Sequence, residues 1–179
     1  MDIEWAKDGI TNQLFITQAR PETVHQSRNR NILITYKLIE KGKLLSQGNA
    51  VGSKIKTGTA WSLKSPTDAG QLDSNTIIVT DTITPDWDPL LKQIAGIITN
   101  KGGRTSHAAI VARELGVPAI VGCGNATTTV KDGQTITLSC AQGKTGYVYE
   151  GKCKFEEKEI DFTNINMPKT EAKMILADP

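Results

Sequence analysis

The sequence predicts an α/β fold, and three apolar runs with their spacing carry that prediction. TIIVTD at 76–81 and AGIITN at 95–100 are short runs rich in β-branched residues, typical of buried strands. A third such run, AIVG, follows at 119–122. Helical signals separate the three runs, so the order is strand, helix, strand, helix, strand, as in an α/β domain.

The elements around these runs are predicted from alternation and turn residues. Residues 32–56 mix strand-like runs with glycines, which predicts short strands joined by turns. Pro85 and Pro89 flank a single helical turn between the first two buried strands. The stretch DGQTITLSCAQGKTGYVYEG, at 132–151, predicts a hairpin after the third strand.

The first 21 residues alternate as a β-hairpin does, with a turn that contains glycine and asparagine. A lone hairpin is marginally stable in water, so we expect this one to belong to a larger sheet. Residues 22–31 are polar and lack periodicity, which indicates a linker or a short helix. We therefore place a boundary there.

Composition excludes several classes of function. The net charge of +2 is too near zero for a nucleic-acid stripe or a polybasic membrane patch. No apolar run approaches the roughly 20 residues of a membrane span, and the start lacks the pattern of a secretory signal. Three widely spaced cysteines without a C-x-x-C pair favour neither a disulfide framework nor a zinc site. We therefore expect a cytoplasmic protein that uses neither nucleic acid nor membrane.

A helix is predicted directly after His107, one of only two histidines in the chain. Ala108, Val111, Ala112 and Leu115 have the spacing of a core-facing helical stripe, and GVP at 116–118 ends it. His107 falls at the edge of the stripe and in the first helical turn. We therefore expect solvent to reach its ring.

The residues before the helix predict an anion site. Thr105 or Ser106 is a natural N-cap, so the first amides of the helix lack intrahelical partners. Those amides, the positive helix end and the flexible Gly102–Gly103 backbone are suited to phosphate, and Arg104 supplies a further cation. Our hypothesis is that His107 is neutral and accepts a phosphoryl group.

The residues alone leave ordinary interpretations open. A histidine at a helix start can simply cap the helix or form a hydrogen bond. Gly-Gly before a helix is common turn chemistry, and this pair belongs to neither a G-x-G-x-x-G nor a P-loop motif.

The whole string GGRTSHAAIVARELGVPAIVG, at 102–122, resembles the phosphohistidine signature of the phosphoenolpyruvate-utilising enzymes. Within that group, two further segments resemble the phosphoenolpyruvate synthases. DIEWAKDG with LFITQARPETV is similar to the last strands of their ATP-grasp domain, and KTEAKMILADP at 169–179 is similar to the first strand of their C-terminal barrel.

The resemblance implies a three-layer β/β/α phosphohistidine domain that swivels between an ATP site and a pyruvate site. His107 matches the histidine that takes a pyrophosphoryl group from ATP, loses the outer phosphate to water and passes the remaining phosphoryl to pyruvate. Thr105 matches a threonine that a regulatory kinase/phosphorylase modifies in the family, where a dianion would compete for the helix N-terminus. An N-cap role for Thr105 stays open.

The resemblance also assigns roles in the N-terminal hairpin. Glu4 matches a Mg²⁺ ligand, and Gln18 and Arg20 match residues that contact the phosphates of ATP. Without the body of the ATP-grasp domain they cannot form a working site, and isolated strand charges are usually solvated.

The resulting domain prediction has three parts. Residues 1–24 are the end of an ATP-grasp domain, 25–160 the phosphohistidine domain, and 161–179 a linker and the first strand of the barrel, with hinges near 22–31 and 158–170. Both ends then read as cut from a longer enzyme, and this piece alone is not expected to complete the reaction. Frayed termini of a complete protein are the other interpretation.

Two further functions stay open. Pyruvate phosphate dikinase uses phosphate where the synthase uses water, and Ser106 weakens the distinction between the two. A stand-alone phosphocarrier module is the other, although an unpaired terminal strand at 173–177 argues against it.

Overall fold

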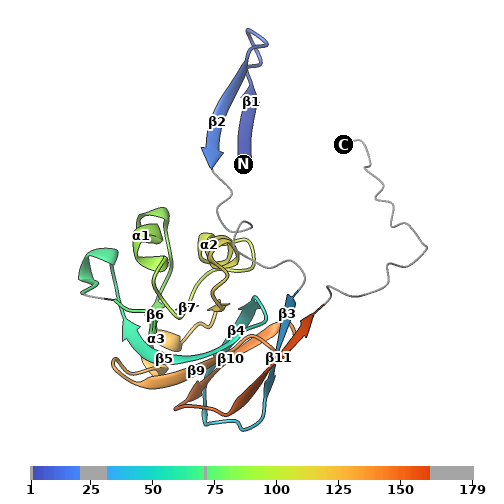
Figure 1. The fold of residues 1–179 in the computed structure, drawn as a ribbon. Helices are drawn as coiled ribbons and strands as arrows, with labels where there is room; N and C mark the ends of the chain where they lie inside the picture. Colours follow the sequence, from blue (N-terminus) through green and yellow to red (C-terminus); the bar gives the residue numbers. More distant parts are fainter. Residues whose placement is uncertain (1, 21–31, 71, 162–179) are drawn as a thin grey trace, which may run out of the picture.

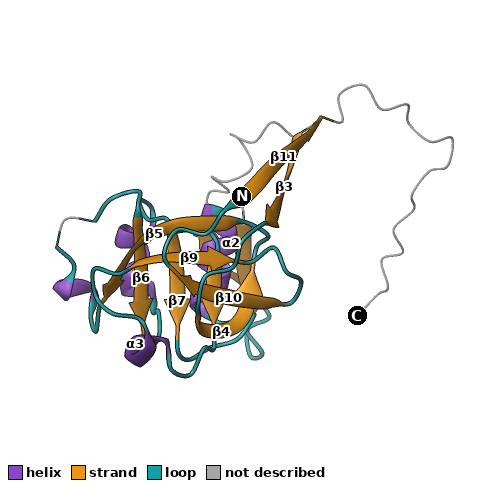
Figure 2. Ribbon diagram, turned by 90° about the horizontal axis from the view of Figure 1, so that it is seen from below, coloured by secondary structure: helices purple, strands orange, loops and turns teal. Residues whose placement is uncertain are grey.

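Seven strands close into a barrel in the computed structural model, which describes residues 2–20, 32–70 and 72–161. Their order around the barrel is β10, β4, β8, β7, β6, β5, β9. Figures 1 and 2 show the barrel in two views. The strands are β4 (Leu44–Val51), β5 (Ile55–Ser62), β6 (Thr76–Thr80), β7 (Gly96–Thr99), β8 (Ala119–Val121), β9 (Thr135–Ser139) and β10 (Thr145–Glu150). The α/β class is confirmed, as are the strands predicted at 76–81, 95–100 and 119–122; closure into a barrel was not predicted.

Four neighbouring strands, β5 to β8, run parallel to one another. Every residue of β6, β7 and β8 is buried, because helices cover one face and the barrel interior lies on the other. This double burial explains why the three runs are continuously apolar or β-branched rather than alternating. The carboxyl ends of these strands therefore meet at one edge of the barrel.

The remaining strands complete the barrel by antiparallel pairing. β9 and β10 form the predicted hairpin, in which Tyr147 pairs with Ser139. β4 lies between β10 and β8, and β5 pairs with β9. β5 alternates in burial along its length, as a strand with one covered face does.

Short helices cover the parallel strands on one side of the barrel (Figure 1). They are η1 (Pro66–Asp68), η2 (Pro85–Trp87), α1 (Asp88–Leu91) and α2 (His107–Leu115). The short helix α3 (Ala126–Thr129) instead contributes Ala126 to the core inside the barrel. The α2 stripe packs against Trp87, Leu91 and Ile78 in one core, and a second core fills the barrel around Ile98 and Leu138. The predicted helical turn between Pro85 and Pro89 is thus confirmed.

A separate two-stranded ribbon pairs β3 (Ile32–Leu38) with β11 (Phe155–Asp161). In its register Asp161 lies opposite Ile32, so the described part of the second predicted hinge, 158–161, is paired strand. The remainder of both predicted hinges lies outside the described residues, as does the predicted strand at 173–177.

The N-terminal residues form the predicted hairpin, β1 (Asp2–Lys7) with β2 (Leu14–Arg20). Its turn is held by Asp8, whose carboxylate accepts from the Thr11 amide at 2.9 Å, and by Asn12, which adopts a positive φ of 58°. Trp5 and Ile16 are paired in register and both exposed. That exposed apolar pair fits the expectation of a larger sheet.

Candidate functional site

The predicted phosphate loop leaves the carboxyl end of β7 and runs from Asn100 to Ser106, where α2 begins. This is the edge at which open parallel sheets usually bind ligands. Backbone bonds tie the loop to the turn after β8: the Cys123 amide donates to the Thr99 carbonyl at 2.9 Å, and the Gly124 amide to the Asn100 carbonyl at 3.0 Å. The loop is thereby held by the sheet beneath it.

Glycine is required at two points of this contact. Gly102 has a φ of +102°, and a Cβ there would lie 2.9 Å from Ser106 Oγ. Gly122 has a φ of +73°, and a Cβ there would lie 2.7 Å from the Gly102 carbonyl oxygen. Both positions combine left-handed backbone with close approach, which only glycine tolerates. Gly103 has open space around it and φ outside that region.

The N-terminus of α2 is free of side-chain caps. Ser106 is the N-cap, as predicted, yet its hydroxyl donates to the Gly103 carbonyl at 2.8 Å and accepts nothing from the helix. Thr105 is exposed and is not the cap. The Ala109 amide donates to the Ser106 carbonyl at 3.0 Å, whereas the described bonds leave the His107 and Ala108 amides open to a ligand. An uncapped helix start favours an anion. At the other end Gly116 terminates the helix in the left-handed conformation, as expected.

His107 lies at this helix start, with 26% of its side chain exposed, so the predicted access to solvent is confirmed. Its Nε2 lies 2.8 Å from Asp88 Oδ1. Asp88 is the first residue of α1. Sequence reasoning missed Asp88: the turn that carries it was predicted, but its contact with a residue 19 positions away was not.

Two arginines brace the loop from outside. Arg113 donates from Nη2 to the Arg104 carbonyl at 2.7 Å. Arg104 itself donates from Nη2 to the Lys144 carbonyl at 3.2 Å, which joins the loop to the turn of the β9–β10 hairpin. Arg113, which sequence reasoning also missed, is recognisable only as the basic residue in the last turn of α2.

A second layer of polar contacts surrounds the loop base. Lys101 pairs with Asp81 at 2.6 Å, and the hydrogen bond from this ammonium lowers the pKa of the Asp81 carboxyl. Asn100 donates to Thr127 Oγ1 at 2.6 Å. These groups join the ends of β6 and β7 to α3 and keep the loop in place.

The hairpin residues are not brought to this loop by anything that the structure describes. The register pairs Glu4 with Gln18 and Asp2 with Arg20. The side chains of Glu4, Gln18 and Arg20 lie outside the described part of the chain, so their nucleotide and Mg²⁺ roles stay predictions. Across residues 2–20, 32–70 and 72–161 no cluster of three or more His, Cys, Asp or Glu could hold a metal ion.

The cysteines form no disulfide in the structure, as predicted. Burial raises the pKa of the Cys123 thiol to about 11 and that of Cys140 to about 12. These thiols are protonated at neutral pH and are poor nucleophiles.

None of the helices in the described ranges is long and apolar enough to cross a membrane.

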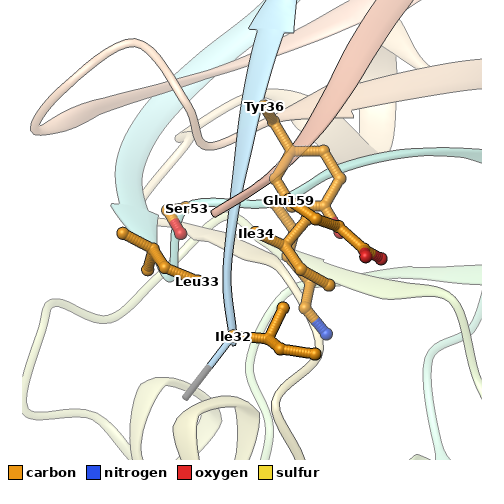
Figure 3. A pocket seen from close by; sticks show the side chains of 7 residues that line it. Ile32, Leu33, Ile34, Tyr36, Ser53 and Glu159 are labelled. Atoms are coloured by element: carbon orange, nitrogen blue, oxygen red, sulfur yellow. The ribbon is translucent and has the colours of Figure 1, made fainter. Parts of the chain in front are cut away.

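Two cavities lie elsewhere, and His107 lines neither. The larger, of about 370 Å³, lies against the β3–β11 ribbon and the turn between β4 and β5 (Figure 3). Its walls are mostly apolar, with Ile32, Ile34 and Tyr36 beside Lys54 and Glu159. The smaller, of about 220 Å³, lies at the carboxyl end of α2 beside Gly116. Neither offers a nucleophile beside an anion site.

Comparison with known proteins gives a consistent result. Residues 72–143 match the family described as PEP-utilising enzyme, mobile domain. The chain is 54% identical to a phosphoenolpyruvate synthase of Aquifex aeolicus (strain VF5), a match that covers 100% of the chain and 22% of the relative. It is 49% identical to that of Escherichia coli (strain K12), over 88% of the chain and 20% of the relative.

The chain therefore spans about a fifth of the length of these curated relatives. Among solved structures, Enzyme I (nEIt) matches 43% of the chain and 32% of its own length, at 35% identity and a TM-score of 0.38.

Proposed function

We propose that His107 carries a phosphoryl group between two distant sites of a phosphoenolpyruvate synthase, because residues 72–143 match the mobile domain of the PEP-utilising enzymes and the chain is similar to such synthases throughout. One observation carries the proposal. A partly exposed histidine occupies the first turn of a helix whose N-terminal amides no side chain caps. The imidazole nucleophile and the amides that can bind an anion thus lie at the same helix N-terminus.

The geometry supports the transfer step in chemical terms. A ring nitrogen with a free lone pair forms a bond to phosphorus as the bond to the leaving oxygen breaks, and the leaving group keeps that electron pair. The amides of Gly103, His107 and Ala108, together with the Arg104 side chain, would stabilise the charge on the arriving phosphoryl oxygens. Ser106 supports this by fixing the loop through Gly103.

The proposed parent reaction converts ATP, pyruvate and water to phosphoenolpyruvate, AMP and phosphate in the cytoplasm. His107 accepts a pyrophosphoryl group from ATP, water removes the outer phosphate, and pyruvate receives the phosphoryl that remains. Mg²⁺ would neutralise the phosphates of ATP when bound. By the resemblance of the N-terminal hairpin, the metal site is proposed to belong to the parent's ATP-grasp domain, with Glu4 as one ligand and Gln18 and Arg20 on the nucleotide.

The architecture is proposed to follow from this role. Residues 1–24 would complete an ATP-grasp sheet, 25–160 would be the swivelling domain with its β/β/α layers, and 161–179 would lead into a pyruvate-binding barrel. The partners of the domain are thus the ATP-grasp and barrel domains of the same parent chain. The pyruvate site is proposed to lie in the barrel domain, so this piece alone is not proposed to complete the reaction.

Thr105 is proposed as a regulatory site for a kinase/phosphorylase. Its side chain is exposed and lies two residues before His107. A phosphate on Thr105 would occupy the helix N-terminus and repel the incoming phosphoryl group. A Thr105→Glu variant should then block labelling of His107, whereas unchanged labelling would contradict charge competition.

The synthase is preferred to the dikinase because the whole chain is similar to curated phosphoenolpyruvate synthases. The experiment uses the full-length parent protein with Mg²⁺ and ATP labelled at the β position. We expect an acid-labile label in the wild type and in a His25→Ala control, and none in His107→Ala. Retention of that label in His107→Ala would refute the assignment of the nucleophile.

A further inference from the structure

The contact between His107 and Asp88 restricts where the imidazole can carry its protons. An ionised carboxylate only accepts hydrogen bonds, so the ring nitrogen 2.8 Å from Asp88 Oδ1 must carry a proton. Two protonation states satisfy this, the neutral ring with its proton on Nε2 and the doubly protonated ring. In both states Nε2 has no lone pair.

Nε2 is also the nitrogen that an external donor meets first. Nδ1 is bonded to Cγ, the ring atom that carries Cβ, and so lies near the helix backbone. Nε2 is on the side of the ring away from Cβ. A phosphoryl donor held by another domain therefore reaches Nε2 more readily. In the structure Asp88 occupies that position.

The turn that carries Asp88 is anchored, while its carboxylate can move. Trp87 and Leu91, on either side of Asp88, are 3% and 0% exposed and belong to the core beneath α2. The Asp88 side chain is 46% exposed, so it can change rotamer without disturbing that core. The buried neighbours therefore fix the position of the Asp88 backbone, while a rotamer change of its exposed side chain is enough to break the contact with His107.

Charge adds to this effect. A phosphoryl donor brings several negative charges, and a carboxylate beside Nε2 repels it. A dianionic phosphoryl group on Nε2 would face the same carboxylate, so the closed contact and a phosphorylated Nε2 exclude each other.

From these observations we propose that Asp88 is a positioning residue that holds His107 in an unreactive state until the ring leaves it, which rests on the carrier role proposed above. When the ring leaves Asp88, Nε2 gives its proton to water and Nδ1 takes one from water. The lone pair now on Nε2 forms the bond to phosphorus, and the donor's leaving group departs with its electron pair. Asp88 then repels the phosphorylated ring outward.

The first test measures the ring proton directly, by ¹⁵N NMR of the histidine side chains in the 179-residue chain at a pH where the ring is neutral. We expect the wild-type His107 proton on Nε2. In Asp88→Asn the amide can either accept or donate, so we expect a shift toward the proton on Nδ1. Wild-type protein with the proton on Nδ1 would overturn the proposal.

The matched control is Asp86→Asn, two residues earlier in the same turn. Asp86 pairs with Thr84 and does not contact the ring. Its removal changes the local charge equally, and we expect the His107 tautomer to stay as in the wild type. An equal shift in Asp86→Asn would also overturn the proposal, because charge alone would then explain the effect.

The second test measures reactivity with potassium phosphoramidate, which transfers its phosphoryl group to imidazole with loss of ammonia. His25 serves as the internal reference within each sample. We expect His107 in Asp88→Asn to be phosphorylated roughly threefold to tenfold faster than in the wild type, the effect of one partly exposed charge-assisted hydrogen bond. Equal rates, or a slower variant, would overturn the proposal.

The carrier role of His107 and the positioning role of Asp88 are tested by independent measurements, so either can be refuted alone. Loss of the ATP-derived label in His107→Ala tests the carrier role, and neither the ring tautomer nor phosphoramidate reactivity depends on ATP. Asp88→Ala, checked for folding by its amide NMR spectrum, should give the same direction as Asp88→Asn in both tests.

Discussion

The barrel interior and the loop before α2 lie on adjoining parts of the same strands, yet they are held in different ways. Ile98 on β7 is fully buried in the barrel core and is held by packing. Two residues later the chain enters a loop in which backbone bonds, glycine conformations and two arginines do that work. Packing therefore holds the barrel interior, whereas polar contacts hold the loop, and the His107 and Ala108 amides at its end stay available to a ligand.

The largest expected effect is on the core side of this comparison. Ile98→Ala removes a fully buried side chain and should lower the free energy of unfolding by about 2–5 kcal/mol. Transfer to His107, measured well below the melting temperature, should change little. Urea unfolding and ATP-derived labelling of the same sample check both; a large loss of labelling in folded protein would contradict the separation.

A glycine pair sharpens the comparison on the loop side. Gly122 and Gly124 both adopt positive φ, but only at Gly122 would a Cβ meet the loop, 2.7 Å from the Gly102 carbonyl oxygen. Alanine at either position should cost about 1–2 kcal/mol of backbone strain. Gly122→Ala should in addition displace the loop and lower the rate of labelling at His107. Equal labelling by the two variants would contradict the role of this close approach.

The reactivity of two native cysteines compares the loop with the barrel core without any mutation. Cys123 lies on the turn beneath the loop, with its pKa raised to about 11, and Cys140 is buried in the barrel core. At pH 8 roughly one Cys123 in a thousand is thiolate, so alkylation should be slow and rise about tenfold per pH unit. Cys140 should react only as the protein unfolds. Mass spectrometry after iodoacetamide treatment checks both, and fast alkylation of Cys123 at pH 7 would be inconsistent with its environment.

The smallest effect is expected from Asp81. Its folded pKa is lowered, chiefly by the hydrogen bond from Lys101, so the carboxylate contributes stability above its unfolded pKa of about 3.9. That contribution is lost as the pH falls through the folded pKa. Asp81→Asn should therefore be slightly less stable than the wild type at pH 7, and the difference should shrink as the pH falls through the folded pKa of Asp81. A deficit that stays constant as the pH is lowered, measured by urea unfolding, would contradict this origin.

Much of the fold could be predicted from local patterns. The stripe from Ala108 to Leu115, the left-handed Gly116 and the buried runs at β6 and β7 each depend on neighbours within a few residues. Closure of the barrel through the pairing of β5 with β9 joins residues about 80 positions apart, and no local pattern encodes it.

The site was predictable only in part for the same reason. His107, Gly102 and the N-cap position follow from the loop's own sequence. Asp88 and Arg113 act through contacts that tertiary structure creates, and the hydroxyl of Ser106 bonds to Gly103 because the loop turns back on itself. Composition and spacing carry no record of such contacts.

The most direct measurement locates the phosphoryl group itself. Full-length protein is incubated with Mg²⁺ and β-labelled ATP, digested under alkaline conditions that preserve phosphohistidine, and mapped by mass spectrometry. The account predicts phosphate on His107 in the peptide that continues into α2. Label found on another residue, with His107 unmodified, would contradict it.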